Sequence, residues 1–101
     1  MNPKLDTVDH VAIAVQDIQP AIDWYRSNFQ CELLYQDATW ALPRFANIKL
    51  ALVSPSQHPP HLGFFRPDAA VFGALTGHRD GTKSVYINDP AGNLVEILQS
   101  E

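Results

Sequence analysis

Residues 8–25, VDHVAIAVQDIQPAIDWY, predict a strand that leads directly into a helix. Through residue 16 the side chains alternate: bulky β-branched residues form one face, and His10 forms the other with two alanines. This alternation is typical of a strand. Asp17 can then cap a helix in which apolar residues recur at helical spacings, namely Ile18, Ile22, Tyr25 and Phe29. We expect the bulky face of the strand to pack on this helix, and the alanine face to leave room for another group.

The rest of the first half predicts three more strands, at residues 31–36, 38–42 and 48–54, with a turn at 44–47. The stretch SPSQHPP at 54–60 combines prolines and serines, which oppose regular structure. We interpret it as a linker between two halves of the chain.

The second half predicts a strand, a helix and two strands, at residues 61–65, 66–77, 83–88 and 93–99. Asp68 would cap the helix and Gly77 would close it. Between the last two strands, Gly92 of the sequence DPAG can adopt the left-handed backbone angles that close a hairpin.

The two halves repeat one pattern. His10 and His61 each start a short apolar strand, and each precedes a helix-capping aspartate by seven residues. The closing stretches LALVS and VEILQ can be aligned, which places Ala51 opposite Glu96. We therefore expect two related modules, roughly 8–54 and 61–99, packed around a pseudo-twofold axis.

Two imidazoles and one carboxylate on one inner surface form a metal-ligand set. The repeat relates His10 to His61, and strand parity places Glu96 on the face of its strand that also carries two leucines. Imidazole nitrogen and carboxylate oxygen suit Zn, Fe, Mn, Ni or Co. A lone histidine is usually structural, but matched positions in a repeat favour a metal site. Three protein ligands leave coordination positions open, which is a feature of catalytic sites.

Composition bounds the class of protein. A chain of 101 residues with 46% apolar and 18% charged residues predicts one globular domain, residues 1–101. The single cysteine, Cys31, excludes an internal disulfide and fits a cytoplasmic protein. A net charge of −4 without a basic cluster argues against a nucleic-acid partner. The sequence shows neither a leader peptide nor an apolar run long enough to predict a membrane segment.

We expect a homodimer, because so short a chain leaves sheet edges that a partner can cover.

Three stretches resemble the vicinal oxygen chelate superfamily across roughly residues 8–99: VDHVAIAVQDIQPAIDWY, HLGFF and SVYINDPAGNLVEIL. That superfamily includes glyoxalase I, bleomycin- and fosfomycin-resistance proteins, methylmalonyl-CoA epimerase and extradiol dioxygenases. The resemblance implies an α+β fold of two βαβββ modules, whose mostly antiparallel sheet forms a cup around one divalent metal ion (Fe, Mn, Zn or Ni). It implies metal-ligand roles for His10, His61 and Glu96.

Two departures from the family pattern narrow the expectation. Glyoxalase I and the epimerase-like members carry a fourth ligand, Glu or Gln, where this chain has Ala51. This difference argues against glyoxalase I and leaves a two-histidine, one-carboxylate set suited to Fe(II) or Mn. Only 34 residues separate His61 from Glu96, so the second module is shortened. We expect the cup to be shallow or to be completed by a second chain.

The resemblance also implies substrate-contacting residues. In resistance-type members a tyrosine at the position of Tyr86 reaches the substrate, so Tyr86 is the candidate catalytic residue. Ser84 should share its face, and Lys49 shares parity with Ala51 and could meet an anionic group. The substrate-binding candidates are Trp40, Arg44, Lys49, Phe65 and Ser84.

The sequence leaves three classes of function open. The intact ligand triad favours a metal-dependent enzyme that binds a small oxygen-rich molecule by bidentate chelation, as a lyase, isomerase, dioxygenase or transferase. The aromatic residues Trp40, Phe65 and Tyr86 would instead fit a metal-free, drug-binding protein of the bleomycin-resistance type. The short second module would fit a scaffold without chemistry. We assign no role to His58 and His78, which we expect in loops.

Overall fold

The computed structural model describes residues 5–78 and 81–99. Its elements in chain order are β1 (Thr7–Ala14), α1 (Ile18–Asn28), β2 (Glu32–Gln36), β3 (Trp40–Arg44), β4 (Lys49–Val53), β5 (His61–Arg66), the 3₁₀ helix η1 (Ala69–Phe72), β6 (Thr76–Gly77), β7 (Lys83–Asn88) and β8 (Leu94–Gln99). Strands dominate and there is one α-helix among the described residues, so the predicted α+β class is confirmed. The chain divides into a first unit, His10–His61, and a second unit, Met1–Asp9 with Leu62–Glu101.

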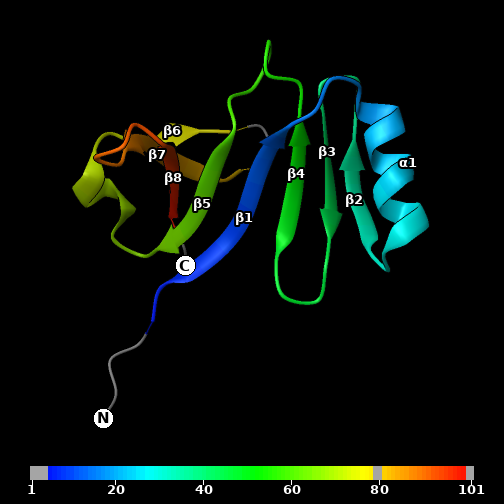
Figure 1. The fold of residues 1–101 in the computed structure, drawn as a ribbon. Helices are drawn as coiled ribbons and strands as arrows, with labels where there is room; N and C mark the ends of the chain where they lie inside the picture. Colours follow the sequence, from blue (N-terminus) through cyan, green and yellow to red (C-terminus); the bar gives the residue numbers. More distant parts are fainter. Residues whose placement is uncertain (1–4, 79–80, 100–101) are drawn as a thin grey trace. The chain divides into compact units, whose positions relative to one another are not determined.

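The first unit is a four-stranded sheet with one covering helix. Its strands lie in the order β2, β3, β4, β1, as the right-hand part of Figure 1 shows. β2 pairs with β3 and β3 with β4 in antiparallel fashion, whereas β4 pairs with β1 in parallel. A parallel pair needs a crossover connection. Helix α1 forms part of that crossover and packs against β3 and β4.

The core of the first unit lies under α1. Ile18 and Ile22 of the helix are buried against Ala41 and Leu52 of the strands. Ile13 and Val15, from the bulky face of the predicted first strand, pack beside them. The prediction that this face packs on the helix is confirmed. Burying an isoleucine or leucine side chain contributes about 1.5–3 kcal/mol, so this cluster positions β1 firmly.

Helix α1 begins as predicted but is not capped as predicted. Asp17 occupies the N-cap position, yet its side chain makes no capping hydrogen bond. Only its backbone carbonyl accepts, from the Ala21 N–H at 3.3 Å. The helix ends at Asn28, and Phe29 returns to extended backbone angles. Among the described residues, no helix has the length and apolar character needed to cross a membrane.

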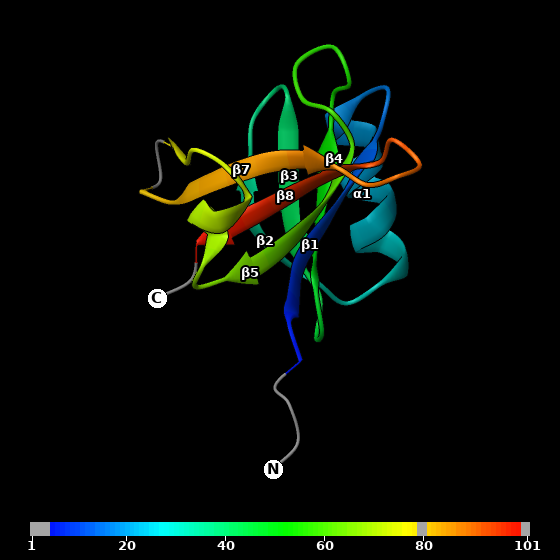
Figure 2. The ribbon, with the colours of Figure 1, turned by 90° about the vertical axis from the view of Figure 1, so that its left-hand side faces the viewer.

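The second unit is a smaller sheet in the order β5, β8, β7, β6. Figure 2 shows β5, β8 and β7 side by side. β5 and β8 are parallel, and the other two pairs are antiparallel. One face is covered by η1, whose Ala69 is fully buried against Val85 and Ile97. The hairpin between β7 and β8 closes at Gly92, whose φ of 87° confirms the predicted left-handed turn.

The helix predicted over residues 66–77 is wrong. Only the four residues of η1 are helical, and Thr76–Gly77 form the short strand β6. Arg66 binds both carboxylate oxygens of Asp68, at 2.8 and 2.9 Å, so that carboxylate is engaged and does not cap the helix. Gly73, with φ of 153°, ends η1 where an L-residue would be strained and its Cβ would lie 3.0 Å from Val85.

The two units repeat one strand register. In the first unit, Ala12 of β1 pairs with Ala51 of β4; in the second, Gly63 of β5 pairs with Glu96 of β8. Both pairs are parallel, and Ala12 and Gly63 each follow a histidine by two residues. The predicted alignment of Ala51 with Glu96 is therefore confirmed.

Candidate metal centre

His10 and His61 face one another within the first unit. Their Nε2 atoms are 2.9 Å apart, and their rings are perpendicular with centroids separated by 5.0 Å. The Nδ1 atom of His61 lies 2.8 Å from the carbonyl oxygen of Pro59. A carbonyl only accepts, so Nδ1 of His61 carries a proton and donates it to this oxygen. Metal-binding histidines show this arrangement, with the other ring nitrogen donating to a carbonyl or carboxylate.

The distance between the two nitrogens fits two neighbouring metal ligands. Metal–imidazole bonds are about 2.0–2.1 Å long, so two such bonds at a right angle place the nitrogens about 2.9 Å apart. At a tetrahedral angle they would be about 3.4 Å apart. Without a metal, the same spacing of 2.9 Å allows His10 Nε2–H to donate to His61 Nε2. Both arrangements use the same tautomer of His61.

Glu96 is a buried carboxylate in the second unit, with an exposed fraction of 6%. Its neighbours Val95 and Ile97 belong to the apolar cluster under η1, so strand alternation turns Glu96 to the other face of β8. The Ser84 hydroxyl donates to Glu96 Oε2 at 2.7 Å. His78 Nε2 lies 3.6 Å from the same oxygen. The charge in the middle of an apolar strand is therefore directed away from the apolar core and into a polar cluster.

Tyr86 of β7 lies directly opposite Glu96 in the strand register. Partial burial, the negative charge of Glu96 and a hydrogen bond to Glu96 raise the pKa of Tyr86 above its usual range. The side chain is therefore a neutral phenol at ordinary pH. It can donate a hydrogen bond, but it is poorly suited to act as a base.

Four of the predicted site residues share one face of the second unit. Cross-strand partners place Gly63, Glu96 and Tyr86 in one row and Phe65, Leu98 and Ser84 in the next. Directly paired residues point to the same side of a sheet. Phe65, Ser84, Tyr86 and Glu96 are therefore neighbours on the face opposite η1.

Trp40 and Lys49 share the face of His10 in the first unit. Trp40 packs on the cluster of Ala12, Ala51 and Val53, and Ala12 has the same strand parity as His10. Lys49 is the cross-strand partner of His10. The alanine face does not stay open along its whole length, because Trp40 and Leu42 cover it.

Arg44 lies farther along the same face. The register places His10, Lys49, Arg44 and Glu32 in one row across β1, β4, β3 and β2. The exposed Arg44 guanidinium forms an ion pair with Glu32. Arg44 is therefore held by an edge strand, two strands away from His10.

The sequence did not indicate His78, and the structure gives this residue a specific partner. His78 Nε2 lies 2.6 Å from the Ser84 hydroxyl. The spacing of residues could not have located it, because its position depends on the unpredicted ending of η1 and on β6. The Pro59 carbonyl that fixes the tautomer of His61 was likewise not evident.

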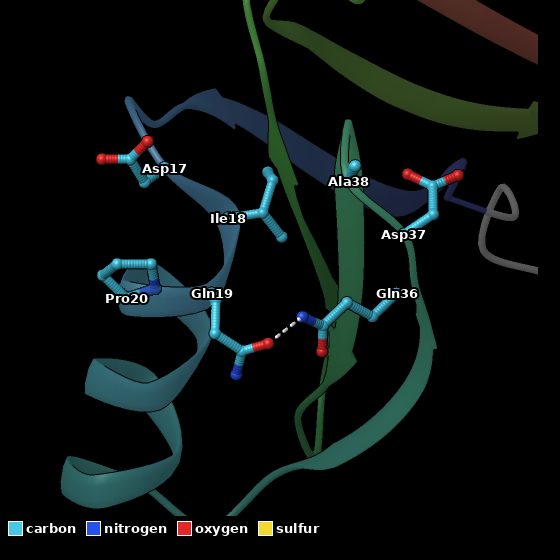
Figure 3. A pocket seen from close by; sticks show the side chains of 7 residues that line it. All are labelled: Asp17, Ile18, Gln19, Pro20, Gln36, Asp37 and Ala38. Carbon is cyan, nitrogen blue, oxygen red and sulfur yellow. Dashed lines mark hydrogen bonds between the residues drawn. The ribbon is translucent and has the colours of Figure 1, made fainter.

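The open depression in Figure 3 is a different feature. It has a volume of about 660 Å³ and lies between the start of α1 and the end of β2. Gln36 Nε2 donates to Gln19 Oε1 across it at 2.8 Å. The lining includes two aspartates, Asp17 and Asp37, but no imidazole or thiol. The depression does not contain any of the predicted ligands.

The residues present fit a divalent metal by their chemistry. The first unit supplies the imidazoles of His10 and His61, and the second supplies the buried carboxylate of Glu96; imidazole nitrogen and carboxylate oxygen are ligand types that bind divalent metals. The hydrogen bond from His61 Nδ1 to the Pro59 carbonyl and the burial of the Glu96 carboxylate suit ligand roles.

A profile of the Glyoxalase/Bleomycin resistance protein/Dioxygenase superfamily matches residues 7–78, and the chain belongs to this superfamily. The match includes both histidines of the pair and ends at His78, before Glu96. The predicted family is confirmed. No curated protein matches the chain.

Solved structures share the fold. A hypothetical protein of Bacillus halodurans C-125 superposes with a TM-score of 0.71 at 14% identity, covering 97% of this chain and 96% of that one. Methylmalonyl-CoA epimerase bound to methylmalonyl-CoA and NH4+ gives 0.73 at 16% identity, covering 94% of each chain. A Streptomyces coelicolor variant of that epimerase, bound to 2-nitronate-propionyl-CoA, gives 0.73 at 16% identity and the same coverage.

Proposed function

We propose that this protein is a divalent-metal enzyme that acts on a small oxygen-rich molecule through two adjacent oxygen atoms of the substrate. The observation that carries the proposal is the histidine pair. Two imidazole nitrogens meet at 2.9 Å, and the Pro59 carbonyl lies 2.8 Å from Nδ1 of His61, so the other ring nitrogen, Nε2, faces His10. A family whose members include small-molecule enzymes supports the same conclusion.

We propose Glu96 as the third ligand. Strand geometry supports this assignment, because residues two apart on a strand share a face. Gly63 follows His61 by two residues on β5 and pairs with Glu96. Three protein ligands would leave other coordination positions of the metal for two substrate oxygens.

Other residues of the chain would bind and orient the substrate. Bound in this way, a divalent metal would polarise the two substrate oxygens and stabilise developing negative charge. The neutral phenol of Tyr86 donates its proton to Glu96, and its oxygen can accept a hydrogen bond from a substrate hydroxyl. Lys49 offers a cation to an anionic substituent, while Trp40 and Phe65 supply apolar walls. Ala51 provides no proton acceptor at the position that matches Glu96, which disfavours reactions that need a carboxylate base there.

Metal content tests this proposal directly. The untagged protein is purified, and bound Fe, Mn, Zn and Ni are measured before and after incubation with each ion. We expect about one equivalent per chain, falling sharply in His10→Ala, because a binding site depends on each ligand. His58→Ala is the matched control, since His58 bonds the Thr39 hydroxyl at 3.1 Å in the same unit. Less than about a tenth of an equivalent in the wild type under every condition contradicts the proposal.

A second candidate function is metal-free binding of an aromatic drug. The supporting observation is an aromatic pair: Trp40 stacks on Tyr35 with ring centroids 4.6 Å apart, and Tyr35 is 44% exposed. Drug binding of equal strength with and without a chelator, together with the absence of bound metal, would favour this function over the enzyme.

We further propose that the protein is a cytoplasmic homodimer. β2 and β6 end the strand order of their units, and such edges are commonly covered by a partner. The single cysteine fits a reducing compartment. Light scattering after size exclusion should give twice the chain mass of 11.2 kDa at micromolar concentration. A monomer mass at every concentration tested contradicts the dimer.

A further inference from the structure

Ser84 connects two polar side chains in the second unit. Its hydroxyl donates to Glu96 Oε2 at 2.7 Å, and its oxygen lies 2.6 Å from His78 Nε2. A hydroxyl has one proton, which is committed to the carboxylate. His78 Nε2 must therefore carry a proton and donate to the Ser84 oxygen. The direct distance from His78 to Glu96 is longer, at 3.6 Å, so the shortest connection runs through Ser84.

We propose that His78 is a positioning residue, which acts through Ser84 to orient the Glu96 carboxylate for metal binding. This inference rests on the proposed role of Glu96 as a ligand. Outer hydrogen-bond partners of this kind orient a ligand and are commonly needed for full metal affinity.

Burial gives this chain of hydrogen bonds a single arrangement. Ser84 is completely buried and Glu96 is 6% exposed, so bulk water cannot replace either bond. Tyr86 donates to the same carboxylate from the opposite position on β7. A carboxylate has about four lone-pair sites, so two donors orient it and still leave lone pairs for a metal.

The repeat indicates that this polar cluster is specialised. Ser84 pairs with Leu98, two residues after Glu96; in the first unit, Trp40 pairs with Val53, two residues after Ala51. Trp40 and Ser84 therefore occupy matched positions. In the first unit the matched set is an apolar cluster, whereas in the second it is a carboxylate with its hydrogen-bond donors. Of the two matched positions, Ala51 lies in an apolar cluster, and Glu96 is the one that accepts a hydrogen bond from the side chain of Ser84.

Metal affinity separates positioning from a purely structural role. Mn(II) binding is measured by calorimetry for wild type, His78→Leu, Ser84→Ala and His78→Gln, with the unfolding temperature of each metal-free protein. We expect His78→Leu and Ser84→Ala to bind about 10–100-fold more weakly. His78→Gln keeps an N–H donor at a similar reach and should recover most of the affinity. His58→Leu, the matched control on the Thr39 hydroxyl, should bind like wild type.

Wild-type affinity in His78→Leu, or no recovery in His78→Gln, overturns the proposal. A second measurement remains decisive even if a variant fails to fold. Long-range ¹H–¹⁵N spectra of the metal-free wild type should show a proton on His78 Nε2, and an unprotonated Nε2 overturns the proposal. The wild type could bind no metal and still carry a proton on His78 Nε2. That result would contradict both the metal-dependent function and the ligand-positioning role, while the hydrogen bond from His78 to Ser84 would be supported.

Discussion

Ala51 and Glu96 show how one side chain distinguishes two copies of the same strand. They occupy matched register positions, opposite Ala12 and Gly63 respectively. Ala51 is buried in an apolar cluster, whereas Glu96 is buried among hydrogen-bond donors. An uncompensated buried charge would be costly, so these donors are a condition for retaining the carboxylate.

Glu96→Gln tests the charge at this position. The amide oxygen can still accept from Ser84, so the metal-free protein should unfold within a few degrees of wild type. We expect metal affinity to fall by more than about tenfold, because the anionic donor is lost while the shape is kept. Calorimetry with Mn(II) measures the affinity and a thermal melt measures the stability. Unchanged affinity would show that Glu96 is not a ligand.

At the scale of elements, alternation predicts strands well in this chain and local motifs predict the second helix poorly. β7 and β8 lie at or within one residue of their expected bounds, since side-chain period and turn residues both mark them. The stretch after β5 carried an aspartate and a glycine at plausible helix ends. The ion pair of Asp68 with Arg66, and the backbone requirement at Gly73, depend on contacts that the local pattern does not contain.

The core under α1 should tolerate truncation poorly. Leu52 of β4 is completely buried between strand and helix neighbours. We expect Leu52→Ala to lower the free energy of unfolding by about 2–5 kcal/mol, through lost burial and the cavity left behind. Urea denaturation measures the change, with Leu34→Ala as the control, because Leu34 is 44% exposed. Equal losses in the two variants would contradict this core assignment.

The turn between β2 and β3 should make stability depend on acid pH. The Tyr35 hydroxyl and the backbone N–H groups of Thr39 and Trp40 donate to Asp37, and they hold the pKa of Asp37 well below its usual range. A lowered folded-state pKa contributes stability above the unfolded-state value of about 3.9, and this stability is lost as pH falls below it. Urea midpoints of wild type and Asp37→Asn should therefore differ at pH 6 and converge towards pH 2. A constant difference would contradict this role.

At the scale of the whole molecule, the internal repeat made the site predictable. From the sequence alone it matches His10 with His61 and aligns Ala51 with Glu96, and the strand registers agree with that alignment. His78 and the Pro59 carbonyl could not be found in this way. They act through hydrogen bonds that non-repeated segments position.

Metal should stabilise the folded protein, because the proposed ligands are brought together only in the folded state. A ligand at 100 times its dissociation constant adds about 2.7 kcal/mol to the free energy of unfolding. For a chain of this size such a gain raises the unfolding temperature by about 10 °C or more. Calorimetric melts with saturating Mn(II) and with a chelator measure the difference. The same unfolding temperature under both conditions would contradict metal binding to the folded protein.

The identity of the atoms around a bound metal tests the proposed centre most directly. X-ray absorption of the Zn(II)- or Mn(II)-loaded protein counts imidazole ligands by their characteristic outer-shell scattering. We predict two imidazoles with oxygen donors and no sulfur in the wild type, and one imidazole in His61→Ala. A wild-type spectrum with fewer than two imidazoles, or one unchanged in His61→Ala, would contradict the assignment of His10 and His61 as ligands.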